Sequence, residues 1–403
     1  MERDLTTGSI GRNILKFSLP YFLSYFLQTL YGMADLFIIG QFNGVASTTA
    51  VSIGSQVMHM ITVMIVGIAM GTTVMIGKSV GAKQKKETSK IIGNTVSLFV
   101  CLSVVLTVVL LFFVRIMSTP QQAVEGTTAY LTICFAGIPL ITAYNIISSI
   151  FRGLGDSKSP MYFIAVACGV NIVLDYVFIG GLHFGASGAA LGTTLAQTIS
   201  VIVALIALIA IRKKDTGISL KRSDLKPEGK TLKNILGIGI PISLQDGFIQ
   251  ISFIVITIIV NQRGLNDAAA VGIVEKIISF VFLVPSSMLS AVSAIAAQNI
   301  GAGKDERAAK TLKYAVMISM SFGLCVAVLM QFISNFVVGI FTSDAVVIYM
   351  GSQYIRSYIW DCMIAGIHFS YSGYFCAYGK SGISFLHNVL SIVLIRIPGA
   401  YFA

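Results

Sequence analysis

The chain has 403 residues, of which 55% are hydrophobic and only 11% are charged. Soluble globular domains carry about 25% charged residues, so this composition excludes an ordinary soluble protein. The apolar residues form long runs, and a helix needs about 20 such residues to cross a bilayer, so the length predicts roughly eleven or twelve spans. We therefore expect an all-α, polytopic helical membrane protein.

Eleven apolar runs can be assigned along the chain. They cover roughly residues 14–40, 50–77, 89–114, 127–151, 160–182, 186–211, 233–260, 268–297, 311–337, 347–377 and 383–403. The first run is longer than the core of a signal peptide, and no A-x-A cleavage site follows it. We expect it to be retained as a transmembrane helix.

The net charge of +11 is distributed unevenly between the two sides of the predicted membrane. Of the 28 Lys and Arg residues, 23 fall at the N-terminus or in loops on one side, and Arg152 is counted there in a turn. Only Arg115 and Arg263 fall in loops on the other side. By the positive-inside rule, this asymmetry predicts a multi-pass protein of the cell membrane with a cytoplasmic N-terminus. The charge is thus a topology signal, and we expect no nucleic-acid partner.

The sequence repeats itself. ILKFSLP at 14–20 matches ILGIGIP at 235–241, and SVGAKQKKETSK at 79–90 matches NIGAGKDERAAK at 299–310. Six spans per half is an even number, so both halves enter the membrane in the same sense and form parallel repeats.

The repeat predicts a division into two lobes. We expect an N-terminal six-helix lobe at 1–212, a cytoplasmic linker at 213–232 and a C-terminal lobe at 233–403. The second lobe has room for only five of its six helices, so the twelfth helix is expected to be missing.

The first half contains two intramembrane acids, Asp35 and Asp175, and no Lys or Arg in the interior of a span. At about 1.5 Å per residue, both acids and Thr193 lie roughly 10 Å below the outer surface. Asn171 precedes Asp175 by one helical turn and shares its face. Two carboxyls, an amide and a hydroxyl at one depth suit a hard cation or a shared proton. The alternative is that both acids are structural and hydrogen-bonded to backbone, Tyr or Ser.

The second half has three acids within its spans, and these could form a C-terminal polar site. They are Asp246, Glu275 and Asp361. Three bases, Lys276, Arg356 and Arg396, accompany them. Because charges at bilayer depth need partners, we expect this set to neutralise itself by pairing.

Other polar and small residues suggest packing. We expect His59, His368 and His387 to be isolated core or interfacial residues, and the six cysteines to be small apolar fillers without a disulfide or metal. The G-x-x-x-G pairs Gly67/Gly71 and Gly188/Gly192 indicate close helix approach.

Nothing in the chain indicates catalysis. There is no H-E-x-x-H, no G-x-S-x-G and no Walker loop. We therefore expect no enzyme activity and no cofactor. Without a nucleotide site, any pumping must draw on an ion gradient.

The order of several segments carries a family resemblance. These are LPYFLSYFLQTLYGMADLFIIGQFNG, VGAKQKKE, FRGLGDSKSP, NIVLDYVFI and FGASGAALGTTLAQ. Together they resemble multidrug and toxic compound extrusion (MATE) transporters. The resemblance implies two six-helix lobes around a cavity that faces alternately inward and outward. It also implies export of amphipathic, often cationic organic compounds, and Na⁺ or H⁺ as the coupling ion.

Carried over by position, the family's cation site falls on Asp35, Asn171, Asp175 and Thr193. Any bound metal would be Na⁺ at these four residues. Pro20 matches the family's proline in the first helix, which implies a conformational hinge.

Two other functions remain open at this point. A lipid-linked saccharide flippase of the same superfamily would need a basic cavity, which three intramembrane cations against five acids disfavour. An intramembrane enzyme would need a nucleophile or metal set facing water. We expect small organic substrates, membrane lipid around the helices, and a monomer.

Overall fold

The structure is a computed structural model that describes residues 4–114, 121–213 and 221–402. In these three ranges the ordered elements are all helical, as the composition predicts. Arg3, Arg115 and linker residues 214–220, which entered the topology prediction, lie outside the described residues.

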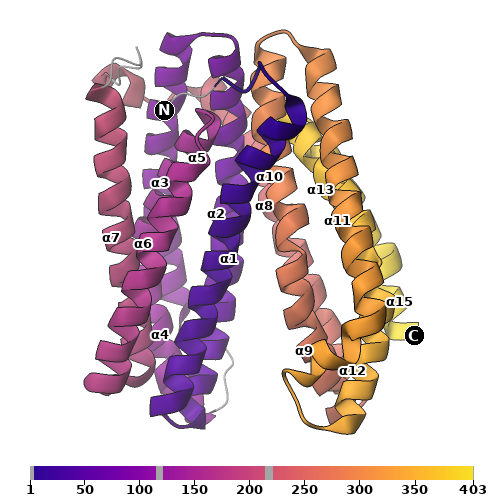
Figure 1. The fold of residues 1–403 in the computed structure, drawn as a ribbon. Coiled ribbons are helices and arrows are strands. Elements are labelled where there is room, and N and C mark those ends of the chain that lie inside the picture. The colour runs from indigo at the N-terminus through magenta and orange to yellow at the C-terminus, as the bar shows by residue number, and fades with distance from the viewer. Residues whose placement is uncertain (1–3, 115–120, 214–220, 403) are drawn as a thin grey trace.

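The helices fall into two lobes (Figure 1). The first contains α1 (Ile10–Phe42), α2 (Val45–Gly81), α3 (Lys85–Phe113), η2 (Gln121–Ala123), α4 (Val124–Ala136), α5 (Ile138–Gly153), α6 (Lys158–Asp175), η3 (Tyr176–Gly181) and α7 (Gly185–Lys213). The second contains α8 (Gly229–Asn261), α9 (Leu265–Val281), α10 (Leu283–Gly301), α11 (Asp305–Gly339), α12 (Ala345–Tyr358), α13 (Asp361–Ala377), α14 (Ser381–Ser391), η5 (Ile392–Arg396) and α15 (Ile397–Phe402). A short helix, η4 (Arg222–Leu225), precedes α8.

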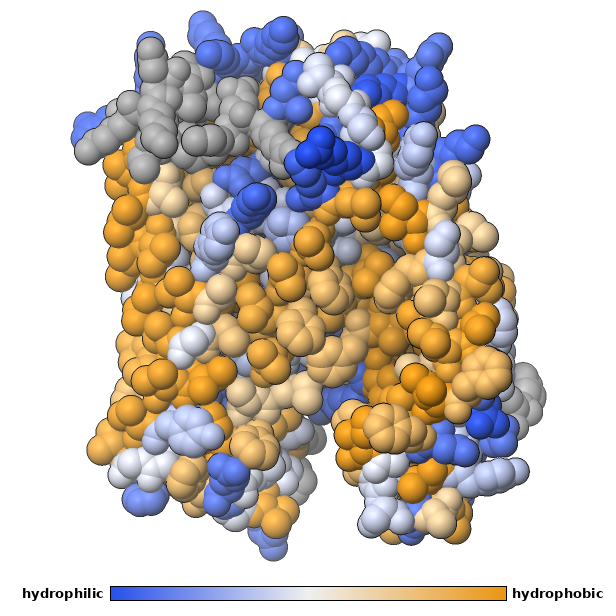
Figure 2. All heavy atoms as spheres, in the orientation of Figure 1, coloured by the Kyte–Doolittle hydropathy of each residue, from blue (hydrophilic) through white to orange (hydrophobic). Residues whose placement is uncertain are grey.

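The two ends of the molecule differ. We call the end that carries the N-terminal segment, the α2–α3 turn, the α10–α11 turn and η4 the basic end, and the opposite one the cleft end. Hydrophobic residues cover the middle of both lobes, and a notch separates the lobes at the cleft end (Figure 2). The lobes therefore touch at the basic end and part at the other.

The helices have the length and hydropathy that membrane spans require. Among the described residues, nine helical segments are long and apolar enough to cross a membrane, and the bent pair α4–α5 is a tenth if it is counted as one span. The remaining predicted span, 347–377, is the pair α12–α13. It contains Arg356 and Asp361, so it is more polar than the others.

Several predicted spans are broken helices. α4 and α5 meet at an angle of 47°, and Pro139 opens α5. Pro139 has no N–H to donate to the preceding turn, and its ring crowds the carbonyl there, which favours a kink or break at this point. α9 and α10 also meet at a single residue, Phe282, with Pro285 in the first turn of α10, but together they form one span of 37 residues.

Glycines allow the lobes to meet at the basic end. A Cβ at Gly71 would collide with the carbonyl oxygen of Ile235 on α8, and one at Gly81 would collide with that of Gln298 on α10. Gly67 lies against Ser243 on α8, so the close helix approach predicted for Gly67/Gly71 occurs between the lobes.

α1 crosses from one lobe to the other. Its first half is buried with α10 and α11 of the second lobe, through a core that includes Leu5, Phe17 and Tyr21. Its second half packs on α6 of the first lobe. Pro20 lies within the part of α1 that contacts the second lobe, since Phe17 before it and Tyr21 after it belong to the same core.

Candidate cation site

Asp35 lies in the second half of α1 and is 2% exposed. The hydroxyl of Thr193, in the third turn of α7, donates a hydrogen bond of 3.2 Å to its Oδ2. Asp175 and Asn171 also interact with the Asp35 carboxyl. The structure thus brings together all four side chains that the sequence placed at one depth.

Asp175 is the last residue of α6 and is fully buried. The helix continues as a π-helical segment, η3, directly after it. Such segments displace backbone groups from the regular ladder and recur at functional sites. Asn171 lies one turn earlier on the same helix and is 1% exposed. No periodicity in the sequence predicts η3.

Gly192 makes room for Asp175. A Cβ at Gly192 would collide with Oδ1 of Asp175, because α7 passes directly over that carboxyl. The sequence assigned Gly188/Gly192 to helix packing alone. Gly188 does pack against Phe178, but Gly192 belongs to the wall of the site. The sequence shows that residue 192 has no side chain, but it does not show that the Asp175 carboxyl faces it.

Most oxygens of the site have no hydrogen-bond partner among the described residues. These are Oδ1 of Asp35, both carboxyl oxygens of Asp175 and the amide oxygen of Asn171. Buried polar atoms are normally satisfied, so unpaired oxygens from three side chains indicate a ligand that donates or carries positive charge. A Na⁺ ion, or protons shared by the two carboxyls, would satisfy them.

The surroundings of the carboxyls are aromatic and thiol side chains. Asp35 is close enough to Tyr31, Tyr130, Cys134 and Cys168 to interact electrostatically with them. None of these supplies a positive charge. Within the described residues, no group of three or more His, Cys, Asp or Glu gathers in a way that could hold a metal ion. A site with two carboxyls and neutral oxygens fits a monovalent cation or a proton better than a transition metal.

Arg152 departs from the sequence prediction. It was placed in a turn, but it is helical, in the last turn of α5, and 8% exposed. Its guanidinium carbon lies 4.3 Å from the ring centroid of Tyr21, a cation–π contact. Among the first-lobe side chains that the structure describes, Arg152 is therefore the one buried base, and it lies at the basic end. Arg152 is not among the groups that interact with Asp35 or Asp175.

Pro20 is buried within α1, fifteen residues before Asp35. The residue after it is Tyr21, the partner of Arg152. The hydroxyl of Ser24 donates to the Pro20 carbonyl at 2.8 Å. Both contacts are made by residues that follow the proline, so the turn directly after Pro20 is held to α5 and to its own backbone.

The three acids of the C-terminal lobe are not gathered into one cluster. Glu275 on α9 and Asp361 at the start of α13 both interact with Arg396. Asp246 on α8 lies instead near Cys376. No salt bridge is found for any of these acids in the part of the chain that the structure describes.

The prediction that the histidines are isolated is wrong for two of them. His368 on α13 and His387 on α14 stack with ring centroids 4.9 Å apart and an interplanar angle of 27°. The two residues are nineteen apart in sequence, so no helical spacing relates them, and only the α13–α14 hairpin brings them together. His59 lies on α2, near Lys276.

Comparisons with known proteins identify the family of the chain. A family model named MatE matches residues 20–177 and 241–402. The chain is 28% identical over 399 residues to the probable multidrug resistance protein YpnP of Bacillus subtilis, covering 98% of this chain and 88% of the relative. It is 24% identical over 404 residues to the multidrug export protein MepA of Staphylococcus aureus, with the same coverage.

Solved structures are similar over nearly the whole chain. A transporter of the MOP superfamily from Pyrococcus furiosus matches with a TM-score of 0.91 at 25% identity, over 99% of this chain and 89% of that one. A structure described as the outward-facing conformation of a multidrug resistance MATE family transporter matches with the same values.

Proposed function

The chain belongs to the MatE family of transporters, and we propose that it exports amphipathic organic compounds, often cationic, in exchange for Na⁺ or H⁺. Its relatives YpnP and MepA are named as a multidrug resistance protein and a multidrug export protein. The single observation that supports ion coupling is the buried Asp35–Asp175 pair, which has unpaired oxygens and no base among its neighbours.

The pair can couple an ion to export through its position. Asp35 is on α1, which packs on both lobes, while Asp175 and Thr193 belong to the first lobe alone. Binding of a cation draws the α1 carboxyl toward α6 and α7. Loss of the cation leaves two negative charges facing each other in an apolar bundle, which favours their separation. We expect α1 to absorb that movement at Pro20, where the helix lacks one backbone hydrogen bond.

The direction of the cleft supports the same function. The notch opens at the cleft end, and the relative of matching fold is described as outward-facing. The basic end would then be cytoplasmic, as the positive-inside rule predicts. In this arrangement a bound compound would leave through the notch, while glycine-lined contacts keep the cytoplasmic side closed.

The coupling ion is proposed to be Na⁺, with protons as competitors. Asn171 and Thr193 provide neutral oxygens that a Na⁺ ion needs and that a proton does not require. Protonation of the same carboxyls competes with metal binding, so Na⁺ dependence should grow as pH rises. Asn171→Ala should weaken Na⁺-driven export more than H⁺-driven export.

Export from vesicles tests this proposal. The purified protein is reconstituted into vesicles, and the vesicles are loaded with ethidium or a fluoroquinolone. A Na⁺ gradient alone, a pH gradient alone, or no gradient is then imposed across their membrane. We expect either ion gradient to drive export, with Na⁺ more effective at alkaline pH. If a pH gradient alone drives full export and Na⁺ has no effect at any pH, the coupling is protonic. If neither gradient drives export of any compound, the proposed function fails.

The orientation has its own test. In a variant without native cysteines, a single cysteine at Lys86 or Lys230, both exposed at the basic end, should resist an impermeant maleimide added to intact cells. A cysteine at Gln41, exposed at the cleft end, should react. Labelling in the opposite pattern would reverse the proposed topology.

A further inference from the structure

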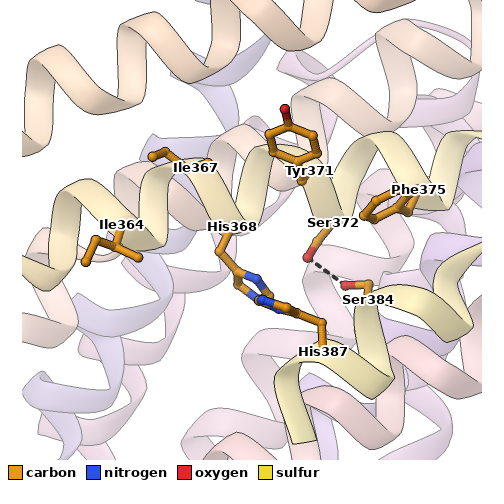
Figure 3. Close-up of a pocket in the computed structure, with 8 residues that line it drawn as sticks. All are labelled: Ile364, Ile367, His368, Tyr371, Ser372, Phe375, Ser384 and His387. Carbon is orange, nitrogen blue, oxygen red and sulfur yellow. Dashed lines mark hydrogen bonds between the residues drawn. The ribbon is translucent and has the colours of Figure 1, made fainter. Parts of the chain in front are cut away.

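The stacked histidines line a cavity in the second lobe. The cavity has a volume of about 320 Å³ and lies between α13 and α14, apart from the Asp35–Asp175 site (Figure 3). Its walls are Ile364, Ile367, His368, Tyr371, Ser372, Phe375, Ser384 and His387. In Figure 3 the two imidazoles face each other across the hairpin, one from each helix.

Polar groups beneath the rings tie both helices to α8. The hydroxyls of Ser384 and Ser372 lie 2.6 Å apart, and Ser384 donates to Oε1 of Gln245 at 2.7 Å. Gln245 is fully buried, and its amide nitrogen has no partner in the protein. The two helices that carry the histidines are therefore joined to α8 four residues past Pro241, the repeat counterpart of Pro20.

Asn388 allows His368 to change its charge state. Its Nδ2 lies 3.2 Å from Nε2 of His368, while its Oδ1 is buried without a partner. The amide can donate to a neutral imidazole nitrogen, and after a half-turn its oxygen can accept from a protonated one. Both charge states of His368 are thus satisfied without moving either helix.

Two stacked imidazoles are best suited to hold a single proton. Histidine is the side chain that titrates nearest to neutral pH. One imidazolium over a neutral imidazole is an attractive cation–π type of contact, whereas two imidazoliums at 4.9 Å repel each other. From this geometry we infer that His368 and His387 form a second proton-binding site, which holds one proton between them and thereby strengthens the contact between α13 and α14.

The charged groups around the two imidazoles form no salt bridge with them among the described residues. The charged groups on the helices that enclose the pair are Lys230, Lys233 and Asp246 on α8, Asp361 on α13, Lys380 in the hairpin turn and Arg396 in η5. Lys230 and Lys233 lie in the first two turns of α8, at the basic end. Residues 283–301, which form α10 behind α13, include no charged side chain. The charged residues of α11 and Lys78 of α2 lie at the basic end. Within the described residues, neither imidazole has a salt bridge to a carboxylate.

Proton uptake by the full chain tests the inference without any transport assay. The purified protein is titrated from pH 8 to pH 6 in weakly buffered detergent. We compare wild type with His368→Gln, His387→Gln and the double variant. His59→Gln is the matched control, since it is a membrane histidine without a stacked partner. Because the pair shares one proton, each single variant should take up as many protons as wild type, and the double variant should take up one fewer.

Other outcomes overturn the inference. If each single variant loses uptake equally and the two losses add in the double variant, the histidines titrate independently. If the double variant loses nothing, the pair does not bind a proton in this range. Histidine NMR signals give a second measure that tolerates small changes in fold. The signals of both rings should move together in wild type, and the remaining ring should still move in each single variant. Failure of vesicle export leaves these results unaffected, so the two proposals fail separately.

Discussion

The two lobes place a proline at corresponding positions, Pro20 in α1 and Pro241 in α8, and then differ in chemistry. In the first lobe, the helix beyond the proline carries Asp35, which meets a second carboxyl and no base. In the second lobe, two of the three acids lie near Arg396, and the ionisable groups that meet in close contact are two imidazoles.

This difference suggests how a duplicated fold can acquire unequal functions. The repeated features are those that packing requires, namely prolines, broken helices and glycine contacts between lobes. The ionisable groups need not repeat, because each must only be neutral or partnered within its own lobe. A surplus of negative charge in one lobe calls for a cation, whereas a mixed set in the other can be balanced internally.

The largest expected effect is on export, from changes to the two carboxyls of the first lobe. Asp35→Asn and Asp175→Asn should each abolish gradient-driven export, because either change removes a charge that the cation neutralises. The double variant should be no worse than the single ones, as expected for residues that act as a unit. Export from vesicles at saturating substrate measures this, with membrane insertion checked by protein level.

The same assay applied to the second lobe sharpens the contrast. Asp361→Asn should retain most export, because Arg396 remains to be balanced by Glu275. If Asp361→Asn is as inactive as Asp35→Asn, or if either first-lobe variant keeps wild-type export, the asymmetry between the lobes is incorrect.

The next largest effect on export is expected from Gly192→Ala. Its Cβ would collide with Asp175, and overpacking at such sites typically costs about 1–3 kcal/mol. We expect export to fall and its dependence on Na⁺ concentration to shift to higher values. Gly169→Ala on α6 is the matched control, since a Cβ there meets nothing within 4 Å. Equal behaviour of the two variants would argue against a tight wall around Asp175.

A smaller effect is expected at the contact between the lobes. Gly71→Ala would push α2 away from the Ile235 carbonyl and destabilise the closed basic end, whereas Gly237→Ala on α8 meets open space. The maleimide accessibility of a cysteine placed near this contact should rise only in Gly71→Ala. Residual export should accompany the change, because the cation site is untouched. Unchanged accessibility would show that the helices do not pack this closely.

The smallest effect concerns the attachment of η4 and α8 to α3. Lys90 forms a 2.7 Å salt bridge with Glu228, and this lysine, with Thr231, holds the pKa of the Glu228 carboxyl below its usual range. A lowered pKa in the folded state stabilises the contact above the usual carboxyl value, and the stabilisation is lost as pH falls through the lowered value. Both side chains are more than a third exposed, so the effect should be small.

Proteolysis of the 221–230 segment measures this contact. Cleavage of wild type should increase slightly on acidification, and Glu228→Gln should show the higher cleavage already at neutral pH. A pH-independent difference between wild type and Glu228→Gln would mean that the salt bridge is not the cause.

The sequence by itself determined the class of the protein and the residues of the first-lobe site. Long apolar runs can only be membrane helices, because a bilayer leaves no other way to satisfy the backbone. Asp35 and Asp175 were recognisable because an acid without a base is costly at that depth, and helical rise alone placed them level with Thr193.

Tertiary structure decided what depends on contacts between distant helices. The role of Gly192 depends on which carboxyl faces it across α6 and α7, and the His368–His387 stack depends on the angle of a hairpin. Arg152 was misplaced because a helix end cannot be located to within a turn from hydropathy, and its burial comes from an aromatic ring on another helix. Periodicity describes one helix at a time, whereas these features are formed by pairs of helices, so they follow from packing and not from pattern.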